Sequence, residues 1–204
     1  MRFIGLCLLG CAGLMAGCAG DQETIKPEAF LQQYQLSRPQ ISAVTYCSSH
    51  DCLERTEISL TEAEWKRISG WVEALAKDAG EEREKLAQAV AEYEKIAAAK
   101  AGTSGDKART GMNSDRQLDC IDESLNTTSI LLLLQEKGFI GYHSLNGTEG
   151  RGEAFDWPHF ATSLRETKSG DIYVIDSWFR DNGEKADILS LADWKRGWNP
   201  PGFK

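Results

Sequence analysis

The stretch that most constrains the fold is residues 117–138, QLDCIDESLNTTSILLLLQEKG. Its apolar run from Ile130 to Leu134 is too broad for a helix with a single buried face, so we predict one long and mostly buried helix. Asp119 is a suitable N-cap with Asp122 three residues later, and Gly138 suits a C-terminal cap. The rest of the chain is therefore expected to pack around this helix.

Cys120 is a lone cysteine at about the first position of the predicted helix. At a helix N-terminus, unpaired backbone N–H groups and the helix dipole favour the thiolate, which lowers the thiol pKa and makes the sulfur nucleophilic. A single cysteine is also often just a small buried apolar residue. The sequence leaves both interpretations of Cys120 open.

The first 17 residues are predicted to be an export signal. Arg2 is followed by an apolar run in MRFIGLCLLGCAGLMAG, which is too short to remain as a membrane span but suits a signal peptide. Leu14 to Cys18 then resemble a bacterial lipoprotein signal. The resemblance implies removal of residues 1–17, lipidation of Cys18, and a location in the bacterial cell envelope facing the periplasm, with the outer membrane favoured by Ala19.

The cysteine count follows from this compartment. Cys7 and Cys11 leave with the signal, so three cysteines besides Cys18 remain in the mature chain. The pair at Cys47 and Cys52 flanks the turn-like stretch SSHD and is the expected periplasmic disulfide. The remaining thiol is Cys120, and a free thiol in an exported protein is unusual enough to favour a catalytic role.

Charge and ligand spacing exclude other classes of function. The chain has a formal net charge of −8, and loss of Arg2 with the signal makes it −9. This charge disfavours nucleic-acid binding, which needs a basic surface. Although His50 lies between Cys47 and Cys52, no second pair of Cys or His follows at zinc-ligand spacing, so we expect no metal and no cofactor.

Composition divides the chain into five segments. We expect a lipidated tether at 18–40 that includes a short helix near Pro27, and a flexible loop at 102–114, rich in glycine and serine. Segment 41–101 is predicted to hold two strands stapled by the disulfide and then two helices, the first starting with a capping box at Thr61 and Glu64. The catalytic core is expected at 115–204, and residues 1–17 are the signal.

The end of the chain is rich in strand-forming residues. We predict strands at 139–145 (FIGYHSL), 156–166 (DWPHFATSLRE) and 171–179 (DIYVIDSWF), with 146–152 (NGTEGRG) as a turn or loop. Helices followed by an antiparallel sheet make an α+β domain, with the cysteine-bearing helix packed on the sheet.

The last two predicted strands allow a test of register. If they form a hairpin about residues 167–170 (TKSG), an even-length loop pairs Ser163 with Val174. His159 and Asp176 then become diagonal neighbours on one face, within reach of each other, whereas a one-residue slip would separate them. We expect this face, which includes Val174, to pack against the Cys120 helix.

A thiol, a histidine and an acid are the groups that cysteine amide chemistry needs. Cys120 opening a helix in QLDCIDES, His159 in WPHFATSL and Asp176 in GDIYVIDSWF occur in this order, and together they resemble the transglutaminase-like superfamily, including its bacterial cysteine proteinases. The resemblance covers residues 117–181. It implies that Cys120 is the nucleophile, His159 the general base and acid, and Asp176 the orienting residue of a papain/transglutaminase-like core.

Two features near the cysteine depart from this pattern. Asp119, Asp122 and Glu123 place negative charge near Cys120, which opposes thiolate formation unless the carboxylates point to solvent. The oxyanion hole would use the Cys120 backbone N–H and one upstream donor, for which Gln117 is the candidate.

The sequence therefore favours a lipid-anchored periplasmic protease or amidase that acts on a peptide or protein through an acyl-thioester on Cys120. Transfer of the acyl group to an amine is the other outcome of the same chemistry, and we favour hydrolysis because water is always present. A non-catalytic lipoprotein that uses the fold as a binding or scaffold module is the alternative from another class. A thiol redox role is weaker, because Cys120 has no partner cysteine nearby.

Overall fold

The structure is a computed structural model that describes residues 23–109, 116–152 and 158–202. The predicted signal peptide and the predicted lipidation site Cys18 lie outside the described residues. Within the described part, no helix is both long and apolar enough to cross a membrane. The elements are, in chain order, α1 (Pro27–Gln33), β1 (Val44–Ser48), β2 (Glu54–Ile58), α2 (Glu62–Glu73), α3 (Ala79–Ala101), α4 (Cys120–Glu136), β3 (His143–Arg151), β4 (His159–Glu166), β5 (Ile172–Asp176), β6 (Asp187–Ser190) and α5 (Leu191–Lys195).

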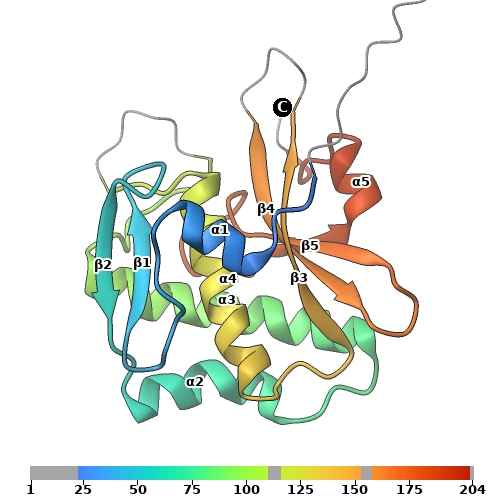
Figure 1. Cartoon of the computed structure of the whole chain (residues 1–204), viewed down its shortest axis with the longest axis horizontal. Helices are drawn as coiled ribbons and strands as arrows, with labels where there is room; N and C mark the ends of the chain where they lie inside the picture. The colour runs from blue at the N-terminus through green and yellow to red at the C-terminus, as the bar shows by residue number, and fades with distance from the viewer. Residues whose placement is uncertain (1–22, 110–115, 153–157, 203–204) are drawn as a thin grey trace, which may run out of the picture.

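The architecture is α+β, as the sequence predicts. One antiparallel sheet has four strands in the order β3-β4-β5-β6, and β1 and β2 form a separate two-stranded sheet. Helix α4 lies between the two sheets and crosses in front of α3, with α2 along the bottom of the molecule (Figure 1). The α+β class is confirmed at this level.

The predicted helix ends are present in the structure. Helix α4 begins at Cys120, and its N-cap Asp119 forms a capping box with Asp122. At the other end, Gly138 has a φ of 77°, and the Gly138 and Phe139 N–H groups donate to the Gln135 and Leu134 carbonyls. This left-handed C-terminal cap is the reason for a glycine at that position. Thr61 and Glu64 likewise form a capping box on α2.

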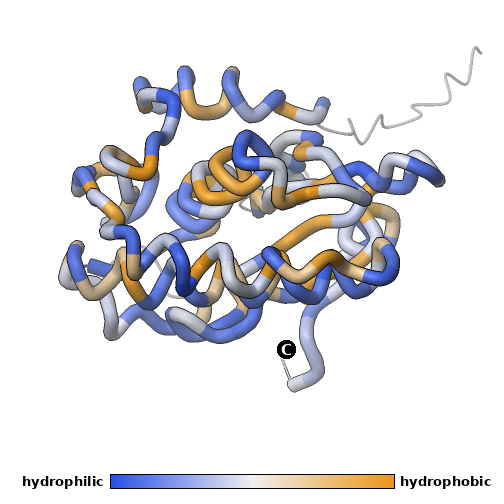
Figure 2. Tube along the Cα trace, turned by 90° about the horizontal axis from the view of Figure 1, so that it is seen from below, coloured by the Kyte–Doolittle hydropathy of each residue, from blue (hydrophilic) through white to orange (hydrophobic). Residues whose placement is uncertain are grey.

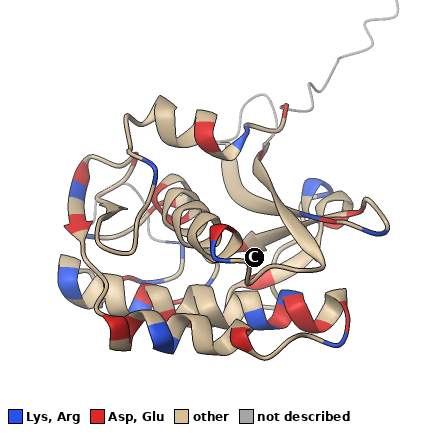
Figure 3. Ribbon diagram, turned by 60° about the horizontal axis from the view of Figure 1, so that its bottom comes forward, with Lys and Arg blue, Asp and Glu red and all other residues tan. Residues whose placement is uncertain are grey.

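A continuous apolar core surrounds α4. Its buried side chains come from α1, both sheets and the helices α2, α3 and α4, and Figure 2 shows apolar residues concentrated on the inner segments. Charged residues lie mainly on the outer helices and loops, whereas α4 carries few along most of its length (Figure 3). The disulfide-stapled segment and the sheet therefore share one core.

The strand β3 corrects the prediction for 146–152, which was expected to be a turn or loop. Strand β3 runs from His143 to Arg151, with a register shift between Leu145 and Gly147. A Cβ at Gly147 would lie 2.2 Å from the Ile25 carbonyl oxygen, and Ile25 bridges to Thr148 in the strand. The glycine therefore permits the N-terminal segment to cover the sheet edge, rather than making a turn.

The hairpin register is confirmed. Ser163 pairs with Val174 and Thr162 with Ile175, and the Glu166 N–H donates to the Asp171 carbonyl at the turn. An even-length loop fixes this register, so His159 and Asp176 come to the same face.

The packing of that face differs from the prediction. Ala161 and Val174, which share the face of His159, pack against Trp194 of α5. Helix α4 meets the opposite face, where Thr162 hydrogen-bonds with Thr128. The expectation that the His159 face would meet the Cys120 helix is therefore wrong. The sequence did not predict α5, which covers the His159 face of the sheet, so the Cys120 helix was the only element expected to pack there.

The end of β5 is also corrected. The strand stops at Asp176, and Ser177 to Phe179, predicted as its continuation, form a turn. The Ser177 hydroxyl donates to Glu123 of α4, 2.8 Å away. This buried contact draws the chain out of the sheet directly after Asp176, and β6 and α5 then complete the domain.

Candidate functional site

A hydrogen-bonded histidine and carboxylate lie where β4 begins and β5 ends. His159 Nε2 is 2.7 Å from Asp176 Oδ2, and the same oxygen accepts the Trp194 indole N–H at 2.8 Å. Asp176 is 1% exposed and His159 9% exposed. Two donors thus compensate the burial of Asp176.

This arrangement fixes the proton positions on His159. Asp176 already accepts from Trp194 and, as a carboxylate, can only accept, so His159 Nε2 carries the hydrogen. Nδ1 is then the basic atom of the neutral ring. It is buried and has no hydrogen-bond partner among the described residues. His159 therefore presents an unused proton acceptor inside the site.

Three aromatic rings surround the His159 imidazole. Its ring centroid lies 4.6 Å from that of Trp178, 5.2 Å from that of Phe179 and 5.5 Å from that of Trp194. The rings hold the imidazole in place and restrict water around it, which strengthens its hydrogen bond to Asp176.

Cys120 lies at the first position of α4 as a free, buried thiol, 8% exposed. Burial raises its pKa to about 12, and the charges of Asp119 and Asp176 act in the same direction, whereas the Phe160 backbone N–H opposes the shift. The helix N-terminus therefore does not prevail over desolvation, and the resting group is a neutral thiol.

The structure brings Cys120 beside the start of β4 but not into a hydrogen bond with His159. Its sulfur is 3.9 Å from the carbonyl oxygen of Pro158. Pro158 directly precedes His159 in the chain, so the thiol contacts the backbone next to the histidine. His159 and Asp176 are thus joined by a direct hydrogen bond, whereas Cys120 contacts the backbone of the residue before His159.

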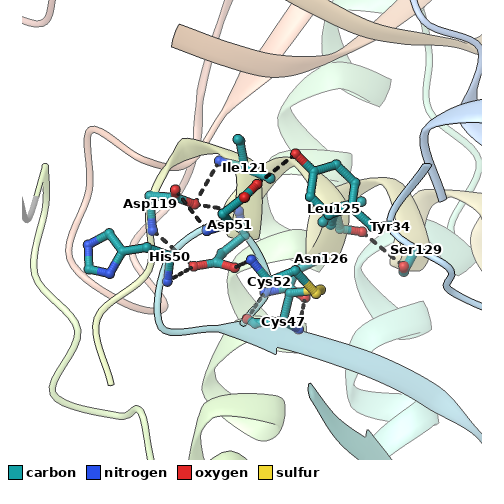
Figure 4. Close-up of a disulfide and its surroundings, with 11 residues drawn as sticks. Tyr34, Cys47, His50, Asp51, Cys52, Asp119, Ile121, Leu125, Asn126 and Ser129 are labelled. Atoms are coloured by element: carbon teal, nitrogen blue, oxygen red, sulfur yellow. Dashed lines mark hydrogen bonds between the residues drawn. A yellow bond between two sulfur atoms is a disulfide. The ribbon is translucent and has the colours of Figure 1, made fainter. Parts of the chain in front are cut away.

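The disulfide loop supports the N-terminus of α4. Cys47 and Cys52 are bonded as predicted, and the Asp122 carboxylate accepts from the His50 and Cys52 N–H groups, both at 2.8 Å. Asn126 binds both backbone groups of Cys47, as the neighbourhood in Figure 4 shows. Asp122 therefore points into this loop rather than toward the thiol.

Gln117 has a different set of contacts. Its amide oxygen accepts the Lys107 N–H at 2.9 Å, and its amide nitrogen is 3.4 Å from the Gly105 carbonyl oxygen. These bonds hold the part of the predicted flexible loop that precedes residue 110, while residues 110–115 lie outside the described residues. An oxyanion role for Gln117 stays a prediction.

A second group of acids lies behind the site. Glu94 of α3 and Glu123 of α4 are buried, and so is Asp106. Burial raises the pKa of Glu94 to about 7 and that of Asp106 to about 6. The pKa of Glu123 is raised well above its ordinary value by burial and then by the charge of Glu94. This cluster meets the site through Ser177.

One group of potential metal ligands is found among the described residues, at Cys47, Cys52 and Asp122. Two of its members are joined as a disulfide and offer no thiolate. The remaining carboxylate is occupied by backbone donors. This set does not suit a metal ion.

Sequence reasoning missed two contributors to the site. Trp194 was not predicted to belong to the site, yet its indole N–H donates to Asp176. Arg151 was placed in a turn, yet it pairs with His159 across β3 and β4. No spacing rule connects Trp194 to the site, whereas recognising β3 as a strand would have revealed Arg151.

Comparisons of the chain with protein-family models, with curated proteins and with solved structures found no match.

Proposed function

We propose that this chain is a cysteine protease or amidase with a transglutaminase-like core, lipid-anchored on the periplasmic side of a bacterial envelope. The observation that carries the proposal is the buried hydrogen bond from His159 to Asp176, which leaves Nδ1 as an unpartnered base. The Cys120 sulfur lies 3.9 Å from the carbonyl oxygen of Pro158, the residue before His159. The order of a cysteine at a helix start, then a histidine and an acid on adjacent strands, further supports it.

The raised thiol pKa favours general-base catalysis over a preformed ion pair. His159 Nδ1 takes the thiol proton as sulfur attacks the amide carbonyl carbon, and the C–N bond then breaks. His159 returns the proton to the leaving amine, which leaves an acyl-thioester on Cys120. Water then attacks the thioester, releasing the carboxylic acid and restoring the thiol. Asp176 stabilises the imidazolium in both steps.

Acylation of Cys120 by p-nitrophenyl acetate would test the proposal. The acetyl group on Cys120 is followed by peptide mass spectrometry while p-nitrophenol release gives the rate. We expect acetylation below pH 8, far below the pKa of the resting thiol, and a loss of roughly a hundredfold or more in His159→Ala. His50→Ala is the matched control, because its side chain lies on the disulfide loop.

A non-catalytic scaffold is the second candidate. The burial of Cys120, its neutral thiol and the lack of a hydrogen bond to His159 among the described residues favour it. This candidate predicts equal acetylation of the wild type and His159→Ala, with a rate that rises only as the thiol itself ionises. That result would remove the catalytic proposal.

A further inference from the structure

Arg151 is the charged neighbour of the His159 pair. Its Cα is opposite that of His159 in the β3–β4 ladder, so the two side chains project from the same face. Its guanidinium carbon lies 4.6 Å from the Trp194 ring centroid and 5.7 Å from that of Phe179. Both rings also contact the His159 imidazole.

Only one nitrogen of the Arg151 guanidinium is used inside the described part of the protein. Nη1 donates to the Trp194 and Trp198 carbonyl oxygens, at 2.6 and 2.8 Å. The edge formed by Nε and Nη2 has no hydrogen bond to any described residue. Arg180 uses the same edge to bind both oxygens of Asp187. Arg151 therefore keeps the edge that fits a carboxylate.

A second arginine lies beside the same rings. The Arg109 guanidinium carbon is 5.7 Å from the Trp178 ring centroid and 6.0 Å from that of Phe179. No carboxylate among the described residues lies within salt-bridge distance of Arg151. Partial burial, with the charge of Arg109, lowers the pKa of Arg151, and only the charge of Asp176 opposes this. A bound anion would compensate the partly buried positive charge of Arg151.

We propose that the Cys120 site selects substrates that carry a carboxylate close to the scissile amide, bound by the Nε–Nη2 edge of Arg151 with Arg109 as a second positive charge. The inference rests on the proposed function for the reaction at the amide, but carboxylate binding by Arg151 does not require that reaction and can be measured separately. The carboxylate can come from a peptide C-terminus or from an acidic side chain, and both present the same planar group.

The test measures binding to the full-length chain by the shifts of the Trp indole N–H signals in NMR. N-acetyl-glycyl-glycine, which has a free carboxylate, is compared with N-acetyl-glycyl-glycinamide, which has none. N-acetyl-glutamic acid α-amide reports a side-chain carboxylate. We expect the acids to bind roughly tenfold more tightly than the neutral amide, with affinity that falls as salt is added. The tighter of the two acids identifies the source of the carboxylate.

Variants separate recognition from folding. Arg151→Gln should lose the preference for the acids, and Arg109→Gln should weaken it. Arg151→Lys retains the charge and one carbonyl contact, so it should keep part of the preference even if Arg151→Gln is poorly folded. Arg55→Gln, an exposed change on β2, removes the same charge and should have no effect. Equal binding of acid and amide by the wild type would overturn the inference.

Alkylation gives a second readout at the thiol. Iodoacetate and iodoacetamide differ by the same replacement of an amide by a carboxylate, and mass spectrometry locates the product at Cys120. Relative to Arg151→Gln, we expect the wild type to favour iodoacetate roughly tenfold. Carboxylate preference without acetylation by p-nitrophenyl acetate would remove the proposed function and retain the binding site. Acetylation without carboxylate preference would do the reverse.

Discussion

Two kinds of buried acid lie on either side of Ser177, and they are stabilised in opposite ways. Asp176 receives hydrogen bonds from His159 and Trp194, so its charge is compensated. Glu94 and Glu123 are equally buried, but one oxygen of Glu94 has no partner among the described residues. Burial raises the pKa of both, and the charge of Glu94 raises that of Glu123 further. Similar depth of burial thus goes with two donors on Asp176 and with an unpartnered oxygen on Glu94.

The largest expected effect is at Asp176. Asp176→Ala leaves the His159 and Trp194 donors buried without an acceptor, and we expect it to lower the free energy of unfolding by about 4 kcal/mol. Urea denaturation measures this. Asp176→Asn retains an acceptor oxygen and should cost less than half as much. A loss below about 1 kcal/mol in Asp176→Ala would show that the hydrogen-bonded triplet is not what holds these strands together.

The acid pair should make stability fall with pH. Folding raises the pKa of Glu94 to about 7, so the folded state binds more protons than the unfolded state between about pH 4.5 and 7. The free energy of unfolding therefore falls through this range and levels off above it, with Glu94 contributing at most about 3 kcal/mol. Asp106 and Glu123, raised in the same direction, add to the slope.

Glu94→Gln imitates the protonated acid and should remove the Glu94 share of this slope. Urea denaturation at pH 5 and pH 8 measures it. The variant should match the wild type at pH 5 and exceed its stability at pH 8. Glu84→Gln, an exposed change on the same helix, should keep the wild-type slope. Parallel curves for the wild type and Glu94→Gln would mean that Glu94 is ionised in the folded protein.

The sequence predicted features that depend on neighbouring residues and missed features that depend on contacts between distant parts of the chain. The caps at Asp119 and Gly138 were predicted from local sequence signals. The register that brings His159 to Asp176 was predicted from the even length of the hairpin loop. The disulfide was predicted from the expected compartment and from the spacing of Cys47 and Cys52. These features depend on residues that are close in sequence or on one turn.

Features that depend on distant packing were not predictable in this way. Trp194 reaches Asp176 only because α5 covers the second face of the sheet. Glu123, read as a charge beside Cys120, instead joins Glu94 and Ser177 in the core. A Cys120 pKa lowered by the helix N-terminus was one of the two interpretations that the sequence left open, and burial instead raises this pKa. In each case a long-range contact outweighs the local rule.

The smallest expected effect is at Ser177, which joins the two groups. Ser177→Ala removes one hydrogen bond to Glu123, 2.8 Å long in the wild type, and should cost about 1 kcal/mol. Because this bond opposes the rise in the Glu123 pKa, its loss should raise that pKa further. The free energy of unfolding would then fall more steeply with pH than in Ser169→Ala, an exposed control in the hairpin turn.

The His159 ring signals in NMR decide whether the two groups are independent. If Asp176 is held by its own donors, Ser177→Ala should leave those signals unchanged although it alters the acid pair. A shift of the His159 signals comparable to that caused by Asp176→Asn would mean that the acid cluster positions the His159–Asp176 pair. The two buried groups would then act as one network, with the protonation of Glu123 felt at His159.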